Sequence, residues 1–350
     1  SAKGQERMTA PRPQRNPQLL LQSAPFLRRG ITTPKLMTEV IIGMGPIVLA
    51  AVYFFGLSAI LVILASTAGA VAAEWLLGPG KPRGATLRDG SAILTGIVLA
   101  LCLPPGIPLW MAFLGGFAGI GLGKLAFGGL GQNLFNPALV GRAFLQAAFP
   151  TALTTWSDYG TPASFFAIRE SNFALPFMQA APDAVTAATP LGLMKFEQQS
   201  TALSDLFLGS TAGSLGETSA ILIILCGLIM AFRRSFDWRI PVSILVSVAV
   251  CSAVIWLFDT ARYPPPWAML TSGGLLFGAV YMATDPVTSP LTPKGVWAFG
   301  LGIGVIVVLI RLWGGLPEGV MYAILLGNAA TPLIERVTQP RPFGRGSIEQ

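Results

Sequence analysis

The sequence predicts an all-α membrane protein with about ten membrane-crossing segments, and three observations predict it. Charged residues make up 11% of the 350 residues, whereas soluble domains carry roughly 25%. Apolar runs long enough to cross a bilayer, which takes roughly 20 residues in a helix, recur along the chain. The chain also contains 40 glycines, a residue that is more frequent in spanning helices than in soluble ones.

The apolar runs divide into long and short ones. The long runs predict complete spanning helices at 36–56, 57–78, 107–128, 217–233, 239–258, 296–314 and 317–336. The short runs adjoin prolines, glycines or polar residues, and they lie at 91–103, 135–149 and 267–282. We expect these short helices to stop inside the membrane, where irregular backbone is tolerated only if it is buried in protein or lines a cavity.

The basic residues predict the orientation. With the N-terminus in the cytoplasm, most of the 23 basic residues face the cytoplasm, and the exceptions are Arg142, Arg169, Lys195, Arg262 and Arg311. Because Lys and Arg concentrate in cytoplasmic loops, we expect both termini in the cytoplasm and the long loop on the outer face. The first 35 residues are basic and broken by prolines, so no cleavable signal peptide is expected.

A weak internal repeat predicts the domain organisation. Ala92–Gly96 resembles Ala268–Ser272, and Ala138–Ala143 resembles Ile324–Ala329. An odd number of spans in each half makes the halves face opposite ways, and inverted repeats with interrupted helices place binding sites at the repeat interface. Chance similarity among Gly-, Ala- and Leu-rich helices is the alternative. The repeat predicts a cytoplasmic arm, a first five-helix repeat, an outer-face loop, a second five-helix repeat and a cytoplasmic tail, at 1–35, 36–149, 150–216, 217–336 and 337–350.

Several kinds of chemistry are excluded by composition. The chain has no histidine, which excludes His-ligated haem, the usual zinc sites and a His-based catalytic triad. Its three cysteines, Cys102, Cys226 and Cys251, lie inside apolar runs and match no metal-binding or disulfide spacing. We interpret them as small buried apolar residues. No metal site is expected, and redox chemistry in this chain would need a cofactor held by other residue types.

Two stretches at the end of the long loop are candidate binding elements. The first is Asp183–Leu191, in which a Thr between Ala and Pro is by itself a loop or helix-capping residue. The second, Gly209–Thr218, is rich in Gly and Ser and opens a helix. Such a turn is either an ordinary N-cap or an anion-binding site, with Ser214, Gly216, Glu217 and Thr218 as candidates. We interpret Glu217 as a first-turn capping carboxylate rather than as a proton donor.

The ends of the short helices are further candidates. Broken helices expose backbone groups that a bound cofactor could satisfy, which makes Asn136, Arg142 and Asp285 candidate cofactor-binding residues. Asp285, before Pro286, is equally a residue that caps and turns the chain. Glu39 and Glu74 lie near the ends of predicted spans, and we interpret them as interfacial residues.

Taken together, several stretches resemble the family that includes the D subunit of the Rnf complex and, more distantly, the B subunit of the sodium-pumping NADH:quinone oxidoreductase. The resemblance covers most of the chain from about 36 to 345. It is carried by Leu87–Pro105, Phe127–Phe149, Asp183–Leu191, Gly213–Ser219, Trp238–Pro241, Ala283–Gly295 and Pro317–Leu326.

This resemblance implies a covalent flavin. Asp183–Thr189 resembles the Asp-x-x-Ser-Gly-Ala-Thr motif, at which a flavin transferase links FMN through its phosphate to the hydroxyl of the last Thr. Thr189 occupies the acceptor position, preceded by Ala188, while Asp183 matches the acidic residue and Thr186 the Ser. Ala187 stands where Gly is usual. The resemblance also implies a riboflavin within the membrane domain.

The resemblance further implies a place in a larger assembly. The fold would be like that of urea and ammonium transporters, in a multi-pass protein of the bacterial inner membrane. The chain would be one subunit of a translocase that moves electrons between ferredoxin and NAD⁺ with Na⁺ or H⁺ translocation, alongside other membrane and peripheral subunits that hold the Fe–S clusters and the nucleotide site.

A small-solute channel or transporter without a flavin is the alternative function, because inverted repeats with broken helices suit it equally. The basic N-terminal arm could contact anionic lipid headgroups or a soluble partner. We expect no nucleic-acid binding, because the basic residues follow the topology and form no groove with aromatic residues.

Overall fold

The computed structural model describes residues 32–79, 84–156, 166, 168–176, 189–197, 202–209, 211–217, 219–260, 262–315 and 318–340. Over these residues all regular secondary structure is helical, which confirms the predicted all-α class. The chain from Thr33 onward forms one compact unit.

Five helices among the described residues are long and apolar enough to cross a membrane. They are α1 (Thr33–Phe55), α2 (Leu57–Leu77), α4 (Leu109–Gly123) with the turn η2 (Leu125–Phe127), α10 (Arg239–Phe258) and α13 (Pro293–Trp313). Each coincides with a predicted long span, because an uninterrupted apolar run in lipid must satisfy its backbone within a helix. The protein is a membrane protein.

The other predicted segments are also helical but shorter or less apolar. They comprise α3 (Ser91–Leu101), α5 (Pro137–Ala148), α9 (Ala220–Phe232) and α14 (Val320–Thr338). The last short segment is divided into α11 (Pro266–Thr271), α12 (Leu275–Phe277) and a π-helical turn, η6 (Gly278–Met282). That all ten segments cross the membrane stays a prediction.

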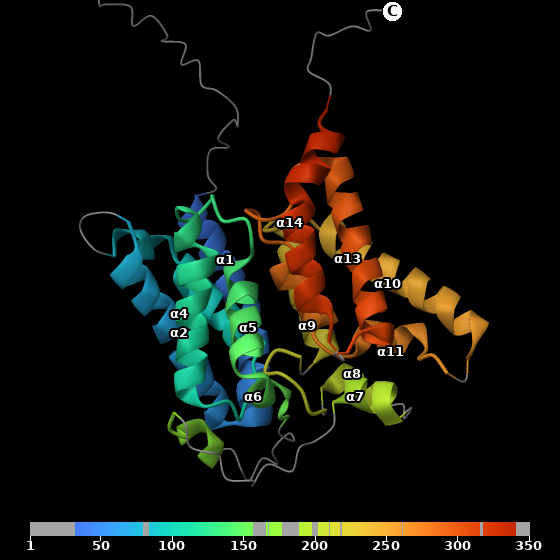
Figure 1. Cartoon of the computed structure of the whole chain (residues 1–350), viewed down its shortest axis with the longest axis horizontal. Coiled ribbons are helices and arrows are strands. Elements are labelled where there is room, and N and C mark those ends of the chain that lie inside the picture. The colour runs from blue at the N-terminus through green and yellow to red at the C-terminus, as the bar shows by residue number, and fades with distance from the viewer. Residues whose placement is uncertain are drawn as a thin grey trace, which may run out of the picture. The chain divides into compact units, whose positions relative to one another are not determined.

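The helices pack in corresponding pairs in the two halves of the chain. Helix α2 packs against α4 and α4 against α5, as α10 packs against α13 and α13 against α14. The first half lies on the left of Figure 1 and the second half on the right, and they meet where α1 contacts α9 and α5 contacts α14. This pairing is what a repeat would produce, while the inverted relation of the halves and the likeness to urea transporters remain predictions.

Small residues allow the closest helix pairs to approach. A Cβ added to Gly116 on α4 would run into the backbone of Ser66 on α2. In the second half, a Cβ added to Gly300 or Gly304 on α13 would meet the side chains of Ser243 and Ser247 on α10. Such small-residue interfaces are typical of helix packing in membranes, where close van der Waals contact replaces the hydrophobic effect.

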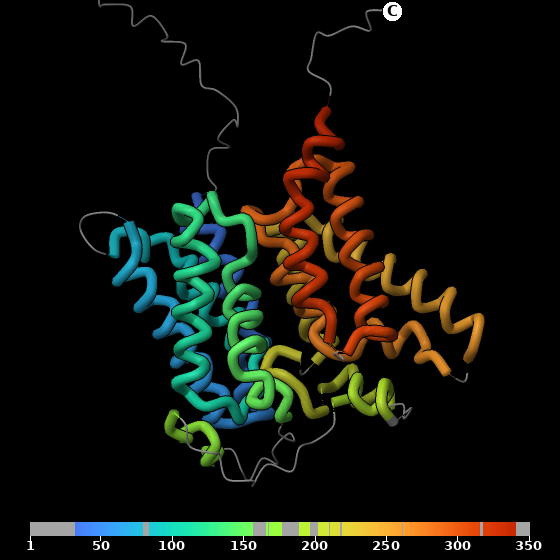
Figure 2. Tube along the Cα trace, in the orientation of Figure 1, coloured from blue at the N-terminus to red at the C-terminus, as the bar shows by residue number. Residues whose placement is uncertain are grey.

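Two of the three predicted short helices, α3 and α11, end ahead of Pro or Gly, and Figure 2 traces the chain in the orientation of Figure 1. That they stop inside the membrane stays a prediction. Helix α3 ends at Leu101, ahead of two prolines, and α11 ends at Thr271, ahead of Gly273, whose φ is +65°. The backbone carbonyl groups freed at the first break accept hydrogen bonds from a distant segment. Leu215 N–H donates to Leu103 O at 3.1 Å, and Gly216 N–H donates to Leu101 O at 2.6 Å.

Short elements cover one end of the helices, at the bottom of Figure 1. They are α6 (Pro150–Thr154), η4 (Glu170–Phe173), α7 (Pro190–Gly192) with the π-helical turn η5 (Leu193–Glu197), and α8 (Leu203–Leu208). Asn172 in η4 anchors this layer by donating to Pro105 O at 3.0 Å and Ile107 O at 2.8 Å. We call this the loop end. The opposite end carries the start of α1, the end of α14 and the turn η1 (Ala85–Asp89).

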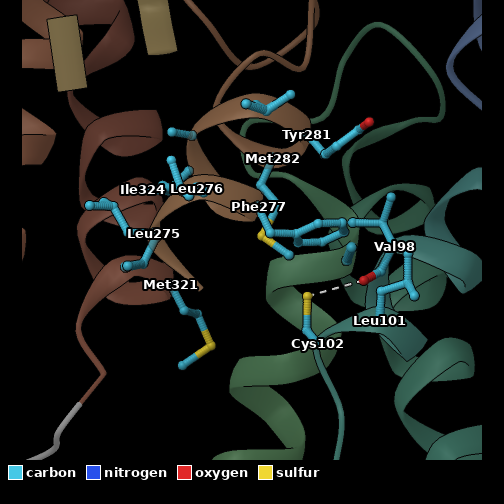
Figure 3. Close-up of a cluster of buried hydrophobic side chains, with 14 of the residues drawn as sticks. Val98, Leu101, Cys102, Leu275, Leu276, Phe277, Tyr281, Met282, Met321 and Ile324 are labelled. Carbon is cyan, nitrogen blue, oxygen red and sulfur yellow. Dashed lines mark hydrogen bonds between the residues drawn. The ribbon is translucent and has the colours of Figure 1, made fainter. Parts of the chain in front are cut away.

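Between the two ends, the contact between the halves is filled with apolar side chains. Leu101 and Cys102 at the end of α3 belong to the same buried cluster as Phe277 of α12 and Ile324 of α14. Figure 3 shows these side chains pointing into one core. The Cys102 thiol donates to Val98 O at 3.1 Å, which agrees with its interpretation as a buried small residue.

Candidate functional site

Thr189 opens the turn α7 at the loop end. It is the N-cap of that turn, and its hydroxyl oxygen accepts a hydrogen bond of 3.1 Å from the backbone N–H of Gly192. Thr189 is half-buried and lines a hollow of about 450 Å³ together with Trp156, Gly213, Glu217, Thr271 and Glu318. We call this space the Thr189 hollow. Thr189 therefore caps α7, as the capping interpretation expects, and its candidacy as an attachment residue stays a prediction.

An ion pair under the hollow joins the two halves of the chain. Arg142 on α5 pairs with Glu318, which lies in the connection from α13 to α14. Their side chains are 12% and 18% exposed, and Glu318 also accepts a hydrogen bond of 2.9 Å from the backbone N–H of Gly274. Arg142 therefore acts as the counter-ion of a carboxylate that sequence reasoning missed. The available signal was Arg142 itself, because a cation within a span is expected to have an anionic partner.

Glu217 does not cap α9, so its interpretation as a capping carboxylate is wrong. The helix begins at Ala220, and Ser219 takes the capping position by accepting a hydrogen bond of 3.4 Å from the N–H of Leu222. The Glu217 carboxyl instead lines the Thr189 hollow together with Glu318. A Cβ added to Gly274 would touch carboxyl oxygens of both.

Arg311 is the second buried cation near the hollow. It lies in the last turn of α13, is 3% exposed, and donates to the carbonyl oxygens of Met269 and Ser272, the latter at 2.9 Å. These carbonyls end α11, where the helix itself supplies no donors. Sequence reasoning placed Arg311 on the outer face, and the structure turns its side chain inward.

Ser214 and Gly216 lie in the turn that closes the break after α3, next to the Thr189 hollow. The N–H of Gly216 is already bonded to Leu101 O and is not available to an anion. Ser214 is 1% exposed, and its hydroxyl oxygen has no hydrogen-bond partner among the described residues. The predicted Gly- and Ser-rich turn thus closes the break after α3 and leaves one buried hydroxyl beside Glu217.

A basic pocket adjoins the Thr189 hollow, and both are lined by Leu191. This pocket has about 790 Å³ of space and is lined by Lys195, Arg262 and Arg311 together with the rings of Tyr263 and Trp313. The Lys195 ammonium donates to Gly314 O at 2.5 Å, at the end of α13, and burial lowers the pKa of Lys195. The three cations would complement an anionic group near Thr189.

Asn136 and Asp285 lie in a different pocket. This interhalf pocket has about 730 Å³ of space and is lined by residues of both halves, including Asn133, Asn136, Tyr281, Thr284 and Asp285. Asn136 caps α5 by accepting from Ala138 N–H at 2.9 Å, and its amide donates to Met282 O at 3.1 Å. Asp285 accepts from Val287 N–H at 3.4 Å, as the turn interpretation requires, and also lines the pocket.

A buried ion cluster stands beside the interhalf pocket. Lys124 is 1% exposed, and its ammonium lies 2.8 Å from both carboxyl oxygens of Glu74 and 2.7 Å from the Ser91 hydroxyl. The depth of Glu74 in the membrane stays a prediction, but Glu74 is fully buried in the protein. The reason is that α4 ends next to α2 and brings a cation to it. Glu39 behaves as expected and pairs with Arg233, which is 62% exposed.

The candidate residues thus divide between two sites. Thr189, Ser214, Gly216, Glu217 and Arg142 gather at the loop end. Asn136 and Asp285 line the interhalf pocket. Asp183, Thr186, Ala188 and Thr218 lie outside the described residues.

Known proteins resemble this chain over nearly its whole length. The model of the NQR2, RnfD, RnfE family matches residues 20–344. The D subunit of the proton-translocating ferredoxin:NAD(+) oxidoreductase complex of Clostridium ljungdahlii is 40% identical over 337 residues, covering 93% of this chain and 96% of that protein. The D subunit of the Na(+)-translocating ferredoxin:NAD(+) oxidoreductase complex of Acetobacterium woodii is 37% identical over 336 residues, covering 95% and 97%.

A third relative is the D subunit of the ion-translocating oxidoreductase complex of Stutzerimonas stutzeri, which is 40% identical over 335 residues and covers 89% of this chain and 92% of that protein. All three relatives are named as subunits of ion-translocating oxidoreductase complexes. The family model covers most of the chain and the relatives are up to 40% identical to it, so the chain belongs to the NQR2, RnfD, RnfE family.

Proposed function

We propose that this chain is the flavin-bearing membrane subunit of a ferredoxin:NAD⁺ oxidoreductase complex that drives Na⁺ or H⁺ translocation. FMN is attached through its phosphate to the hydroxyl of Thr189, and the subunit passes electrons within the complex. The observation that carries the proposal is the position of Thr189, half-buried on the Thr189 hollow. The names of the relatives supply the redox complex.

The residues around Thr189 fit a phosphoester. The hydroxyl reaches a hollow, so an attached group has space on one side. A phosphodiester carries a negative charge, and Lys195, Arg262 and Arg311 in the adjoining pocket are cations. FMN supplies the electron-transfer chemistry when bound, while the protein holds and tunes it. A covalent tether suits a carrier that must remain in place through many cycles.

A second flavin, riboflavin, is proposed for the interhalf pocket. Riboflavin has no phosphate and needs polar partners without strong positive charge. Asn133, Asn136 and Thr284 offer such partners. The cation that lines this pocket, Lys124, is already held by Glu74.

The proposed setting is the bacterial inner membrane, with both termini in the cytoplasm and the loop end outside. A flavin transferase attaches the FMN during maturation, membrane lipid surrounds the apolar helices, and other subunits of the complex supply and accept electrons.

Replacing Thr189 tests the attachment. Wild type, Thr189→Ala, Thr189→Ser and the control Thr271→Ala, which alters another Thr of the hollow, are produced with a flavin transferase. We expect covalent flavin fluorescence on a denaturing gel for wild type and Thr271→Ala, and none for Thr189→Ala, because only a hydroxyl can form the ester. Mass spectrometry of the 170–195 tryptic peptide should show an FMN adduct. Fluorescence that persists in Thr189→Ala would place the attachment elsewhere.

A solute channel is less favoured by the geometry. A channel needs an open path between the halves, and at mid-height that region is filled by buried side chains such as Leu101, Phe277 and Met282 (Figure 3). Purified protein in liposomes is expected to give no more urea or ammonium flux than empty liposomes. Flux above that level would favour the channel.

A further inference from the structure

The Thr189 hollow contains two neighbouring carboxyl groups, an arrangement that favours a shared proton. Glu217 and Glu318 both line this hollow, and a Cβ added to Gly274 would lie 2.8 Å from Glu217 Oε1 and 3.4 Å from Glu318 Oε1. An ionised carboxyl group only accepts hydrogen bonds, so a bond between two carboxyl groups needs a proton on one of them. Two unprotonated carboxylates this close repel each other, and such pairs share a proton in known carboxylate dyads.

The partners of each carboxyl group indicate which one carries the proton. Glu318 has two donors suited to a carboxylate, the Arg142 guanidinium and the backbone N–H of Gly274. Glu217 has no comparable set of donors. Its Oε1 is buried without a hydrogen-bond partner among the described residues. Glu318 is therefore the ionised member, and Glu217 the member that holds the proton.

The surrounding charges allow the pair to exist with or without this proton. The charged groups that face it are Arg142 from α5 and Arg311 from α13, and the uncharged groups beside it are the Cys102 thiol and the Ser214 hydroxyl. With one shared proton, two cations face one carboxylate and the cluster has a charge of +1. Without the proton the cluster is neutral. Neither state leaves an uncompensated negative charge buried, which would be costly.

We propose that Glu217 and Glu318 form a proton-binding site that compensates the charge of each electron arriving at the flavin on Thr189. This inference rests on the proposed function, because it takes the flavin and its electron supply from there. In the resting state the +1 cluster faces the single negative charge of the phosphoester. The carboxyl pair and the attachment residue line the same hollow, which puts the proton near the point of attachment.

The step is balanced in charge and atoms. One electron reaches the flavin from the partner subunits, the O–H bond at Glu217 breaks, and the proton bonds to the reduced ring. A proton from the solution at the loop end then restores the Glu217 O–H bond. The net change is one electron and one proton added, so the hollow keeps its total charge.

The shared proton is tested by infrared spectroscopy of the purified protein in H₂O and D₂O. Wild type should show a protonated carboxyl band near neutral pH that shifts in D₂O and is lost in Glu217→Gln. The control Glu335→Gln, which alters a carboxylate bonded to Leu291 N–H at the opposite end, should keep the band. The same band is expected in Thr189→Ala, which cannot carry the flavin. A wild-type spectrum without the band, or a band that survives in both Glu217→Gln and Glu318→Gln, overturns the site.

The link to the flavin is tested by the pH dependence of its midpoint potential in wild type with FMN attached. One proton per electron corresponds to about 59 mV per pH unit, because a tenfold change in concentration is about 59 mV for a one-electron couple. We expect a slope near this value in wild type and a much smaller slope in Glu217→Gln, with Glu335→Gln like wild type. A merely structural role would leave the slope unchanged.

The two parts fail in distinguishable ways. FMN attached with equal slopes in wild type and Glu217→Gln overturns the proton coupling but leaves the flavin proposal standing. A protein that carries no FMN overturns the proposed function and the coupling together, while the infrared band decides the shared proton by itself.

Discussion

Arg142 illustrates how a single charged residue depends on the far half of the chain. It lies on α5 among apolar residues, and its partner Glu318 is 176 positions away. Burying either charge alone would be costly, whereas the pair with the Gly274 N–H satisfies both groups. The contact therefore joins the first half to the second at the loop end, where Glu318 lines the Thr189 hollow.

Removing one member of this pair should destabilise the protein strongly. We expect Arg142→Met to lower the free energy of unfolding by about 3–5 kcal/mol, because it leaves a largely buried carboxylate without its cation. The double variant Arg142→Met/Glu318→Met should recover much of that loss, since it removes both charges. Thermal unfolding of the detergent-purified proteins measures the loss of stability in the single variant and its recovery in the double variant.

The exposed pair of Arg233 and Glu39 provides the control. Arg233→Met should cost no more than about 1 kcal/mol, because solvent screens an exposed ion pair. Equal losses in Arg142→Met and Arg233→Met would contradict the role given to Arg142.

At the scale of elements, the helix pairs α2–α4 and α10–α13 pack in the same way. In each pair, glycines of one helix lie against the backbone or a small side chain of the other, at Gly116 against Ser66 and at Gly300 against Ser243. The absence of a side chain brings the helix axes close, and the resulting dispersion contacts stabilise the pair in lipid. These interfaces hold the broken helices and the candidate sites between rigid neighbours.

A large residue in such an interface should separate the helices. Gly300→Leu is expected to lower stability by at least about 1–3 kcal/mol, the usual cost of overpacking. Gly302→Leu is the matched control, because it lies on the same helix and a Cβ there meets nothing within 4 Å. The two variants are compared by thermal unfolding and by the yield of folded protein. Similar behaviour of the two variants would show that the α10–α13 contact tolerates added volume.

For the whole molecule, the two ends have different chemistry. The loop end carries the Thr189 hollow and the basic pocket, and the opposite end carries the exposed arginines Arg233 and Arg234. Basic residues concentrate on the cytoplasmic side of membrane proteins, so the loop end is expected outside. In this orientation Thr189, the proposed attachment residue for FMN, and the interhalf pocket lie toward opposite faces of the membrane.

Cysteine labelling tests the orientation. In a background without the three natural cysteines, Ser204→Cys on the loop end should react with a membrane-impermeant maleimide in intact spheroplasts. Asp237→Cys at the opposite end should react only after permeabilisation. Both positions are exposed in the structure, so access depends on the side of the membrane. The reverse pattern would invert the topology.

The sequence by itself determined the helical class and the approximate positions of the main helices, but not the break after Thr271 or the short helices in the loop. Uninterrupted apolar runs leave the backbone no alternative to a helix in lipid, and Pro and Gly mark where helices end. It also indicated Thr189, because the resemblance that marks this residue is carried by neighbouring residues of the chain. Only the tertiary structure decided that Asn136 and Asp285 belong to a different pocket from Thr189, that Glu74 is buried against Lys124, and that Glu217 faces Glu318 instead of capping α9. These outcomes depend on contacts between residues far apart in the chain, and hydrophobic periodicity does not predict such contacts.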